Sequence, residues 1–400
     1  MAKLAYKVEQ ITNTEKNYNL MTSILVWCGL VVVSSLYITI PMVSIFSNMF
    51  RVVPSQASWT TSAFSFAYAV GFLLFAPLSE KYGRKQMMLV GLIALFVITP
   101  ILGFVNQLSL IVILRAIQGL AASTFGPAVL SYVVEMFPIE KRVTTIGFVS
   151  TGFLMAGIVG QVFSSIVSQN LGWSSVFYFL GVIYLLSAVL LTGLVPKDEI
   201  LQKKVSVLAQ FKQMGTLLFK RNFFFCYFIT ITLLLSFVGM YTALGSYLSR
   251  SPFGLNSNQI LVVRTTGIIG MLLSPLAGKL VARFGVRMVL QGGLMLATVG
   301  IGLIGTSSSL PFLVTMSVIF VGGISVTVPT LISLIGNLGG ESRGVAVSLY
   351  TFILFIGATL GPIVALNLLK TGSYILTFEI LAAILCIGFF LSFIVRINEK

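Results

Sequence analysis

Twelve apolar segments, each about as long as a membrane-spanning helix, constrain most strongly what this chain can fold into. They lie at about 21–47, 57–79, 86–105, 108–134, 143–168, 174–195, 223–249, 257–281, 287–306, 309–336, 343–368 and 374–396. A helix needs about 20 apolar residues to cross the hydrocarbon core of a bilayer. The mean hydropathy of the whole chain, +1.03, agrees with that reading. The sequence therefore predicts an all-α membrane protein with twelve transmembrane helices.

Lysine and arginine collect in alternate loops between these segments. If the N-terminus is cytoplasmic, 20 of the 25 cations fall on the cytoplasmic side, and three (Arg51, Arg250 and Lys370) fall on the other side. The positive-inside rule then predicts a multi-pass protein of the plasma membrane with both termini in the cytoplasm. The net charge of +15 follows from this asymmetry, so we expect membrane lipids as partners and no nucleic acid.

The residues that most enzymes and metal sites depend on are scarce. The chain has no histidine, and its three cysteines, Cys28, Cys226 and Cys386, lie in separate apolar segments without metal-ligand spacing. Asp198 is the one aspartate. We therefore expect no enzyme activity, no metal and no cofactor. The first 20 residues precede a span too long for a signal-peptide core, which predicts that no signal peptide is cleaved.

The second half of the chain repeats the first at an offset near 200 residues. The matched pairs are Gly83 and Gly285, Lys85 and Arg287, Pro127 and Pro329, Glu135 and Asn337, Glu140 and Glu341, Arg142 and Arg343, Gly160 and Gly361, and Gly172 and Gly372. Duplication of a six-span unit predicts two pseudo-symmetric halves around a site near the membrane midplane. The predicted divisions are a cytoplasmic tail (1–20), an N-terminal half (21–196), a cytoplasmic linker (197–222) and a C-terminal half (223–400).

The linker between the halves carries apolar residues at helical spacing. Leu201, Val205, Leu208, Phe211 and Leu218 recur at intervals of three, four or seven residues, with lysines between them. This pattern predicts an amphipathic helix at the cytoplasmic membrane surface. The alternative is a flexible tether whose periodicity is incidental.

A short charged turn follows the second span. It reads Ala76-Pro77-Leu78-Ser79-Glu80-Lys81-Tyr82-Gly83-Arg84-Lys85. Gly83 can adopt a positive φ, and the charges sit where two helix ends meet. The stretch resembles the signature loop of the major facilitator superfamily, Gly-x-x-x-Asp-Arg-x-Gly-Arg-Arg, and a degenerate copy runs from Gly278 to Arg287. The resemblance implies a conformational gate made by Glu80, Lys81, Gly83, Arg84 and Lys85.

Three ionisable residues lie well inside apolar segments, where a charge is costly and usually functional. These are Arg115, Arg264 and Glu379. Arg115 and Gln118 belong to a stretch that resembles the Arg-x-x-Gln-Gly motif of the superfamily's drug-efflux branch, which implies a role in proton coupling or the cavity; snorkelling is the alternative. In the fifth span, Gly152, Gly157, Gly160 and Gln161 resemble that branch's antiporter motif only weakly, and packing alone also explains them.

Together these motifs resemble the twelve-span drug:H⁺ antiporter branch of the superfamily. The resemblance implies alternating access powered by a proton gradient, with proton coupling through Glu80, Arg115 and Glu135. It also implies a central cavity for a small-molecule substrate, and we expect a monomer. The substrate-binding candidates are Tyr37, Tyr68, Arg115, Gln118, Gln161, Tyr241, Tyr247, Arg264 and Glu379.

The expected activity is export of small amphipathic organic molecules, as in multidrug efflux. One alternative is a dedicated exporter of an anionic or zwitterionic metabolite, such as a carboxylate-rich metallophore, because two arginines but only one glutamate lie well inside the spans. Importing or facilitating the passage of sugars or organic acids is a further alternative. Arg264 and Glu379 either pair with each other or face the cavity.

Overall fold

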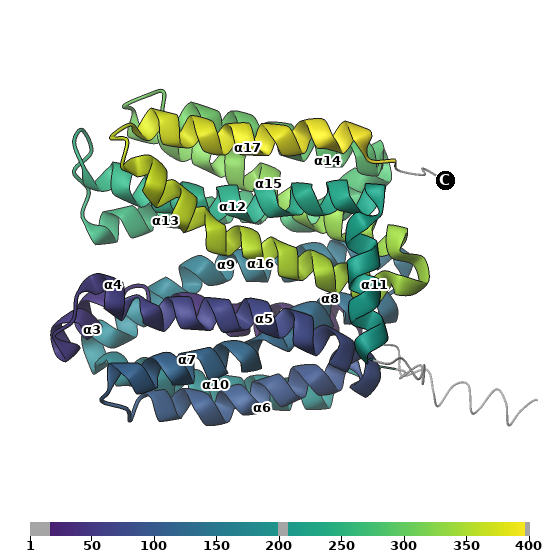
Figure 1. Cartoon of the computed structure of the whole chain (residues 1–400), viewed down its shortest axis with the longest axis horizontal. Coiled ribbons are helices and arrows are strands. Elements are labelled where there is room, and N and C mark those ends of the chain that lie inside the picture. Colours follow the sequence, from purple (N-terminus) through teal and green to yellow (C-terminus); the bar gives the residue numbers. More distant parts are fainter. Residues whose placement is uncertain (1–16, 199–206, 397–400) are drawn as a thin grey trace, which may run out of the picture.

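The computed structural model describes residues 17–198 and 207–396, and all of its regular secondary structure within those ranges is helical. The helices form two bundles, one above the other in Figure 1. The N-terminal half contains α2 (Tyr18–Tyr37), α3 (Val43–Phe50), α4 (Pro54–Ala57), α5 (Trp59–Tyr82), α6 (Arg84–Leu102), α7 (Leu108–Ser123), α8 (Phe125–Met136), α9 (Ile139–Leu171) and α10 (Trp173–Leu194). The C-terminal half contains α12 (Arg221–Ser249), α13 (Ser257–Met271), η1 (Ser274–Leu276), α14 (Ala277–Ile304), α15 (Leu310–Gly339), η2 (Gly340–Ser342), α16 (Arg343–Leu369) and α17 (Tyr374–Ile394).

The observed helices are consistent with the twelve predicted spans. Within the described residues, ten helical stretches are long and apolar enough to cross a membrane. The stretch Gln259–Ile304 is 46 residues long and turns at Gly285, so it contains the eighth and ninth predicted spans. The second predicted span corresponds to α5, whose apolar part is Trp59–Phe75. The fourth is divided into α7 and α8 at Thr124, three residues before Pro127, because proline cannot continue the helical hydrogen bonds of the preceding turn.

The two halves share local geometry at matched positions. Gly83 and Gly285 have φ angles of 99° and 80°, and Gly172 and Gly372 have φ angles of 84° and 81°. Only glycine adopts this region readily, so each matched pair marks the same sharp turn between two helices. The fold is therefore an all-helical bundle of two pseudo-symmetric halves.

The linker helix α11 (Val207–Phe219) lies across one end of the molecule (Figure 1). It contacts α5 of the N-terminal half and α12 and α16 of the C-terminal half. Met214 and Leu217 on its inner face are buried, and the Gln213 amide donates to the Ser342 hydroxyl. Leu201 and Val205 lie outside the described residues.

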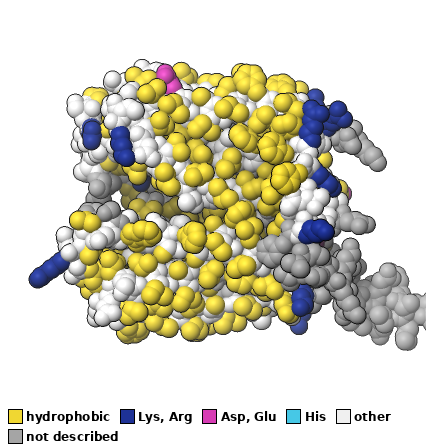
Figure 2. Space-filling view, viewed as in Figure 1, with side chains coloured by type: hydrophobic (Ala, Val, Ile, Leu, Met, Phe, Trp, Pro, Cys, Tyr) yellow, Lys and Arg dark blue, Asp and Glu magenta, His cyan; other side chains and the backbone are white. Residues whose placement is uncertain are grey.

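The charged side chains lie mainly at the two ends of the molecule. Figure 2 shows lysine and arginine at both ends, with an apolar belt between them. We call the end that carries α11, Arg84, Lys141 and Arg343 the basic end, and the end that carries Arg51 and Lys370 the distal end.

Candidate functional site

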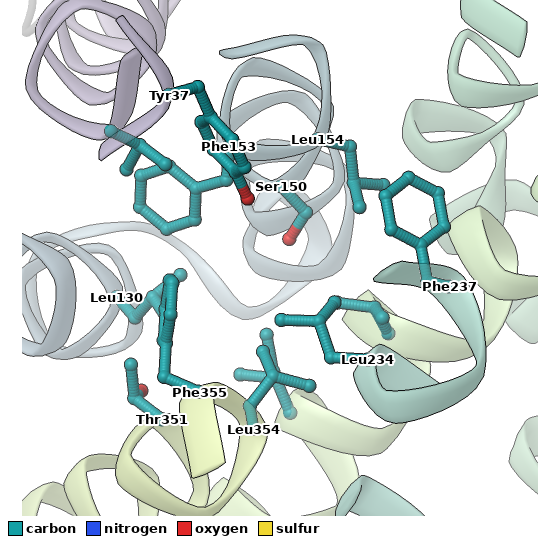
Figure 3. A pocket seen from close by; sticks show the side chains of 13 residues that line it. Tyr37, Leu130, Ser150, Phe153, Leu154, Leu234, Phe237, Thr351, Leu354 and Phe355 are labelled. Carbon is teal, nitrogen blue, oxygen red and sulfur yellow. The ribbon is translucent and has the colours of Figure 1, made fainter. Parts of the chain in front are cut away.

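Three adjoining pockets lie between the two halves and share Tyr37 on α2. Their volumes are about 40, 110 and 310 Å³. The smallest pocket is lined mainly by apolar side chains of both halves, and Figure 3 shows the hydroxyls of Tyr37 and Ser150 among them. Phe237 on α12 and Phe355 on α16 each line two of the three pockets. We call the three pockets together the central cavity.

The central cavity is closed toward the basic end. There the backbones of the halves come so close that a Cβ on Gly147 of α9 would collide with the carbonyl of Ser274. Thr151 donates a hydrogen bond of 3.2 Å to the carbonyl of Met271. Toward the distal end the cavity widens into its largest pocket, and Figure 2 shows a hollow between the halves on that side.

Arg264 on α13 supplies a positive charge to the largest pocket. Its Nη2 donates to the carbonyl of Tyr241 (3.0 Å), and its Nη1 donates to Oε1 of Gln161 across the boundary between the halves (3.4 Å). Its Nε is buried without a hydrogen-bond partner. None of the described residues that line the central cavity is an aspartate or glutamate. The cavity is therefore apolar and aromatic, with one guanidinium near its open end.

Arg115 lies inside the N-terminal half and does not line any of the three pockets. It is fully buried. Its guanidinium donates to the carbonyls of Thr60 (2.9 Å) and Ser35 (2.8 Å). It also donates to Oε1 of Gln118 (2.7 Å), as their three-residue spacing suggested. Its Cζ also lies 4.3 Å from the centre of the Phe64 ring. Through these contacts the Arg115 side chain connects α2, α5 and α7.

Of the other substrate-binding candidates, Tyr37, Tyr68, Gln161 and Tyr241 line the central cavity. Three candidates lie elsewhere, and the first is Gln118, which is fully buried beside Arg115. Tyr247 packs against Phe253, Tyr374 and Phe378 inside the C-terminal half.

Glu379 is exposed on α17, and the ion pairs found among the described residues do not join it to Arg264. The pairing of these two residues, one of the two arrangements considered from the sequence, is thus not present.

The predicted gate residues meet at the basic end. Arg84 is buried and donates to both carboxylate oxygens of Glu135 on α8 (3.0 and 3.3 Å), to Oε1 of Glu80 (3.2 Å) and to Oγ of Ser79 (2.6 Å). The cluster packs directly against Gly344 at the start of α16. Lys81 is exposed, with its Nζ 5.1 Å from the Tyr82 ring centre.

Asp198, which the sequence placed only in the linker, also belongs to this cluster. Its carboxylate accepts hydrogen bonds from the backbone N–H groups of Arg84 and Lys85, the first residues of α6. A carboxylate at a helix N-terminus satisfies free N–H groups and complements the helix dipole. Lys85 in turn donates to the carbonyls of Thr192 and Val195, so the turn is tied to the end of α10. The sequence feature that could have identified Asp198 is its position, because it is the sole aspartate and lies just beyond the sixth span.

Comparison with protein families gives a match over nearly the whole chain. The family model described as the Major Facilitator Superfamily matches residues 25–337 and 253–400. An uncharacterized transporter of Buchnera aphidicola subsp. Acyrthosiphon pisum is 27% identical over 88% of this chain and 86% of its own length. Multidrug resistance protein 3 of Bacillus subtilis is 29% identical, over 30% of this chain and 24% of its own length.

Among solved structures, the chain is similar to the human organic anion transporter MFSD10 (TETRAN). The TM-score is 0.79 at 15% sequence identity, and the match covers 94% of this chain and 99% of the human chain. At this identity the likeness shows a common fold.

Proposed function

The chain belongs to the major facilitator superfamily, and we propose that it is a proton-coupled secondary exporter of small amphipathic organic molecules. The observation that carries this proposal is the central cavity, which lies between the halves, is lined mainly by apolar and aromatic side chains, and is closed at the basic end. Sites for organic ligands have this composition, with a few polar groups that fix orientation.

The arrangement of the halves supports alternating access. The contacts that close the cavity involve glycines and backbone carbonyls at the basic end, and the distal end is hollow. Separation of Gly147 from Ser274, with closure near Gln161 and Arg264, would expose the same cavity to the other side. The positive-inside rule supports a cytoplasmic basic end and cytoplasmic termini.

Proton coupling is proposed on the acidic groups at the basic end. Glu80 and Glu135 both contact the buried Arg84. Both ion pairs lie within the N-terminal half, on the surface that packs against Gly344 of the other half. Protonation of either carboxylate would change the charge of that surface, which would link a proton to the conformational change. The buried charge of Arg115, fixed by carbonyls and Gln118, would stiffen the half that carries this cluster.

The test is transport by the purified protein in liposomes with an imposed pH gradient. We expect a fluorescent amphipathic substrate to accumulate against its gradient when protons flow the opposite way. A protonophore should abolish the accumulation, and liposomes without protein set the background. Uphill transport that persists with the protonophore would overturn proton coupling. The direction of transport is tested separately in inverted membrane vesicles, because an exporter accumulates its substrate inside them.

A dedicated exporter of an anionic or zwitterionic metabolite is the second candidate. Arg264 favours it, because its guanidinium lies in the cavity wall and the described lining carries no carboxylate. Arginine binds carboxylates through paired, charge-assisted hydrogen bonds. Competition between a carboxylate and a quaternary ammonium compound for transport distinguishes the two candidates.

A further inference from the structure

The largest of the cavities described here is not between the halves. It is a groove of about 640 Å³ along the side of the N-terminal half, at the basic end, between α2 and α9. Its α2 wall is made by Tyr18, Asn19, Thr22, Ser23, Val26, Trp27 and Leu30. Its α9 wall is made by Glu140, Lys141, Thr144, Thr145 and Phe148. No step of the proposed transport cycle uses it.

The groove changes from polar to apolar along its length. At the basic end its walls are the polar side chains of Asn19, Ser23 and the α9 pair Glu140 and Lys141, all of them exposed. Both helices begin at the basic end, α2 at Tyr18 and α9 at Ile139. Farther along, the walls are apolar, and Trp27 and Phe148 remain 43% and 44% exposed.

The length of the groove matches one leaflet of a bilayer. The α2 wall extends over twelve residue steps, from Tyr18 to Leu30, which is roughly 18 Å of helix. Half of the hydrocarbon core of a bilayer is about 15 Å thick. A molecule with its polar end at Lys141 and an apolar chain beside Trp27 would therefore span one leaflet, as a phospholipid does.

The charges at the polar end indicate the headgroup. The Lys141 ammonium lies 5.1 Å from the Tyr18 ring centre, which holds it over the groove wall, and Glu140 precedes it in the chain. Neither residue takes part in the ion pairs found among the described residues. A headgroup with a phosphate for the ammonium and a primary amine for the carboxylate complements both charges. Thr22 and Ser23 donate their hydroxyls to backbone carbonyls, so their oxygens can still accept a hydrogen bond from an amine.

We propose that the groove between α2 and α9 binds one glycerophospholipid with a primary-amine headgroup from the leaflet on the basic side. Its phosphate lies at Lys141, its amine at Glu140, and an acyl chain packs along Val26, Trp27 and Phe148. The site also adjoins the closed contact between the halves, because Thr144 of the groove packs against Gly278.

Trp27 gives a direct readout, since the chain has only three tryptophans. A variant with Trp59→Phe and Trp173→Phe keeps Trp27 as the sole fluorophore. It is reconstituted in vesicles of phosphatidylcholine brominated on its acyl chains, which quench Trp27 on contact. Unbrominated phosphatidylethanolamine or phosphatidylcholine is then added at increasing mole fraction, and recovery of fluorescence measures the relative affinity for each headgroup.

We expect phosphatidylethanolamine to relieve quenching about fivefold more effectively than phosphatidylcholine, the gain of one partly exposed ion pair. Glu140→Gln should bring the two lipids to parity, and Lys141→Gln should weaken the binding of both. Lys212→Gln on α11, an exposed lysine away from the groove, should change neither.

Equal relief by both lipids in the parent protein would overturn the proposal, as would a preference that survives Glu140→Gln. If deletion of residues 1–16 is needed before Trp27 is quenched, the N-terminal segment occupies the groove and the proposal is also wrong. None of these readouts requires transport, so they succeed or fail independently of the proposed export activity.

Discussion

Arg84 on α6 donates two hydrogen bonds to Glu135 on α8, from Nη2 to Oε1 at 3.0 Å and from Nε to Oε2 at 3.3 Å. The arginine is buried and the glutamate side chain is 41% exposed. Nη2 of the same arginine also lies next to Gly344 of the other half. The ion pair that stabilises the N-terminal half therefore also forms part of the surface that contacts the C-terminal half.

Glu135→Gln should shift the protein toward states that are open at the basic end. The substitution removes the charge partner that shields Arg84, while Glu80 remains. Because Glu135 is partly exposed, we expect a loss of about 1 kcal/mol, or roughly a fivefold change in population. Spin labels at the exposed residues Ile139 and Phe284, in a cysteine-free background, measure the separation of the halves.

The control for that measurement is Glu379→Gln, which neutralises an exposed carboxylate on α17, away from the Arg84 cluster. Its distance distribution in detergent should match that of the parent. An unchanged distribution in Glu135→Gln would show that the Arg84 cluster does not hold the basic end closed.

Gly344→Ala should prevent full closure at the basic end. A Cβ at this position would meet Oε1 of Glu80 and Nη2 of Arg84. The same labels should report a wider separation, and the transport rate should fall. Gly292→Ala on α14 is a matched control, because a Cβ there has nothing within 4 Å. Normal transport by Gly344→Ala would mean that the two halves need not touch at this point.

The sequence predicted the fold well because its signals are local. Apolar length gives the spans, and the need for positive φ explains why glycine recurs at positions 83 and 285. The break at Thr124 was not predicted, although Pro127 was noted as a repeated residue, because tertiary packing decides whether a proline bends or divides a helix.

The candidate site was only partly predictable. Spacing placed Arg115 and Gln118 on one helical face, and they do share a hydrogen bond of 2.7 Å. It could not tell whether that face meets the cavity or the neighbouring helices, because this depends on the rotation of α7 in the bundle. The rotation of α17 likewise decides the surroundings of Glu379, whose side chain is exposed. Asp198 was missed because its partners are backbone N–H groups far away in sequence.

Arg115→Gln should destabilise the N-terminal half. The substitution removes hydrogen bonds to the carbonyls of Thr60 and Ser35 and leaves a void in a fully buried position. We expect a loss of about 2 kcal/mol and a lower melting temperature in detergent. Arg264→Gln is the comparison, because that arginine borders a cavity and its loss should change the melting temperature less. Equal melting temperatures in both variants would argue against a structural role for Arg115.

Arg264→Gln should weaken transport of a carboxylate substrate more than that of a neutral analogue of the same shape. In the structure Arg264 uses one N–H for Tyr241 and one for Gln161, and its Nε–H has no partner, so donors remain for a carboxylate. Losing one charge-assisted hydrogen bond costs roughly 1.5–3 kcal/mol, a tenfold or greater rise in KM.

Gln161→Glu provides a second variant that keeps the arginine but places a competing carboxylate beside it, and it should impair transport of the anionic substrate in the same way. Transport of both substrates is measured in liposomes under one pH gradient, so that the ratio of their rates cancels any effect on proton coupling or folding. If the ratio stays the same in both variants, or if a quaternary ammonium compound is carried well by the parent and no better by Arg264→Gln, the cavity does not select for negative charge.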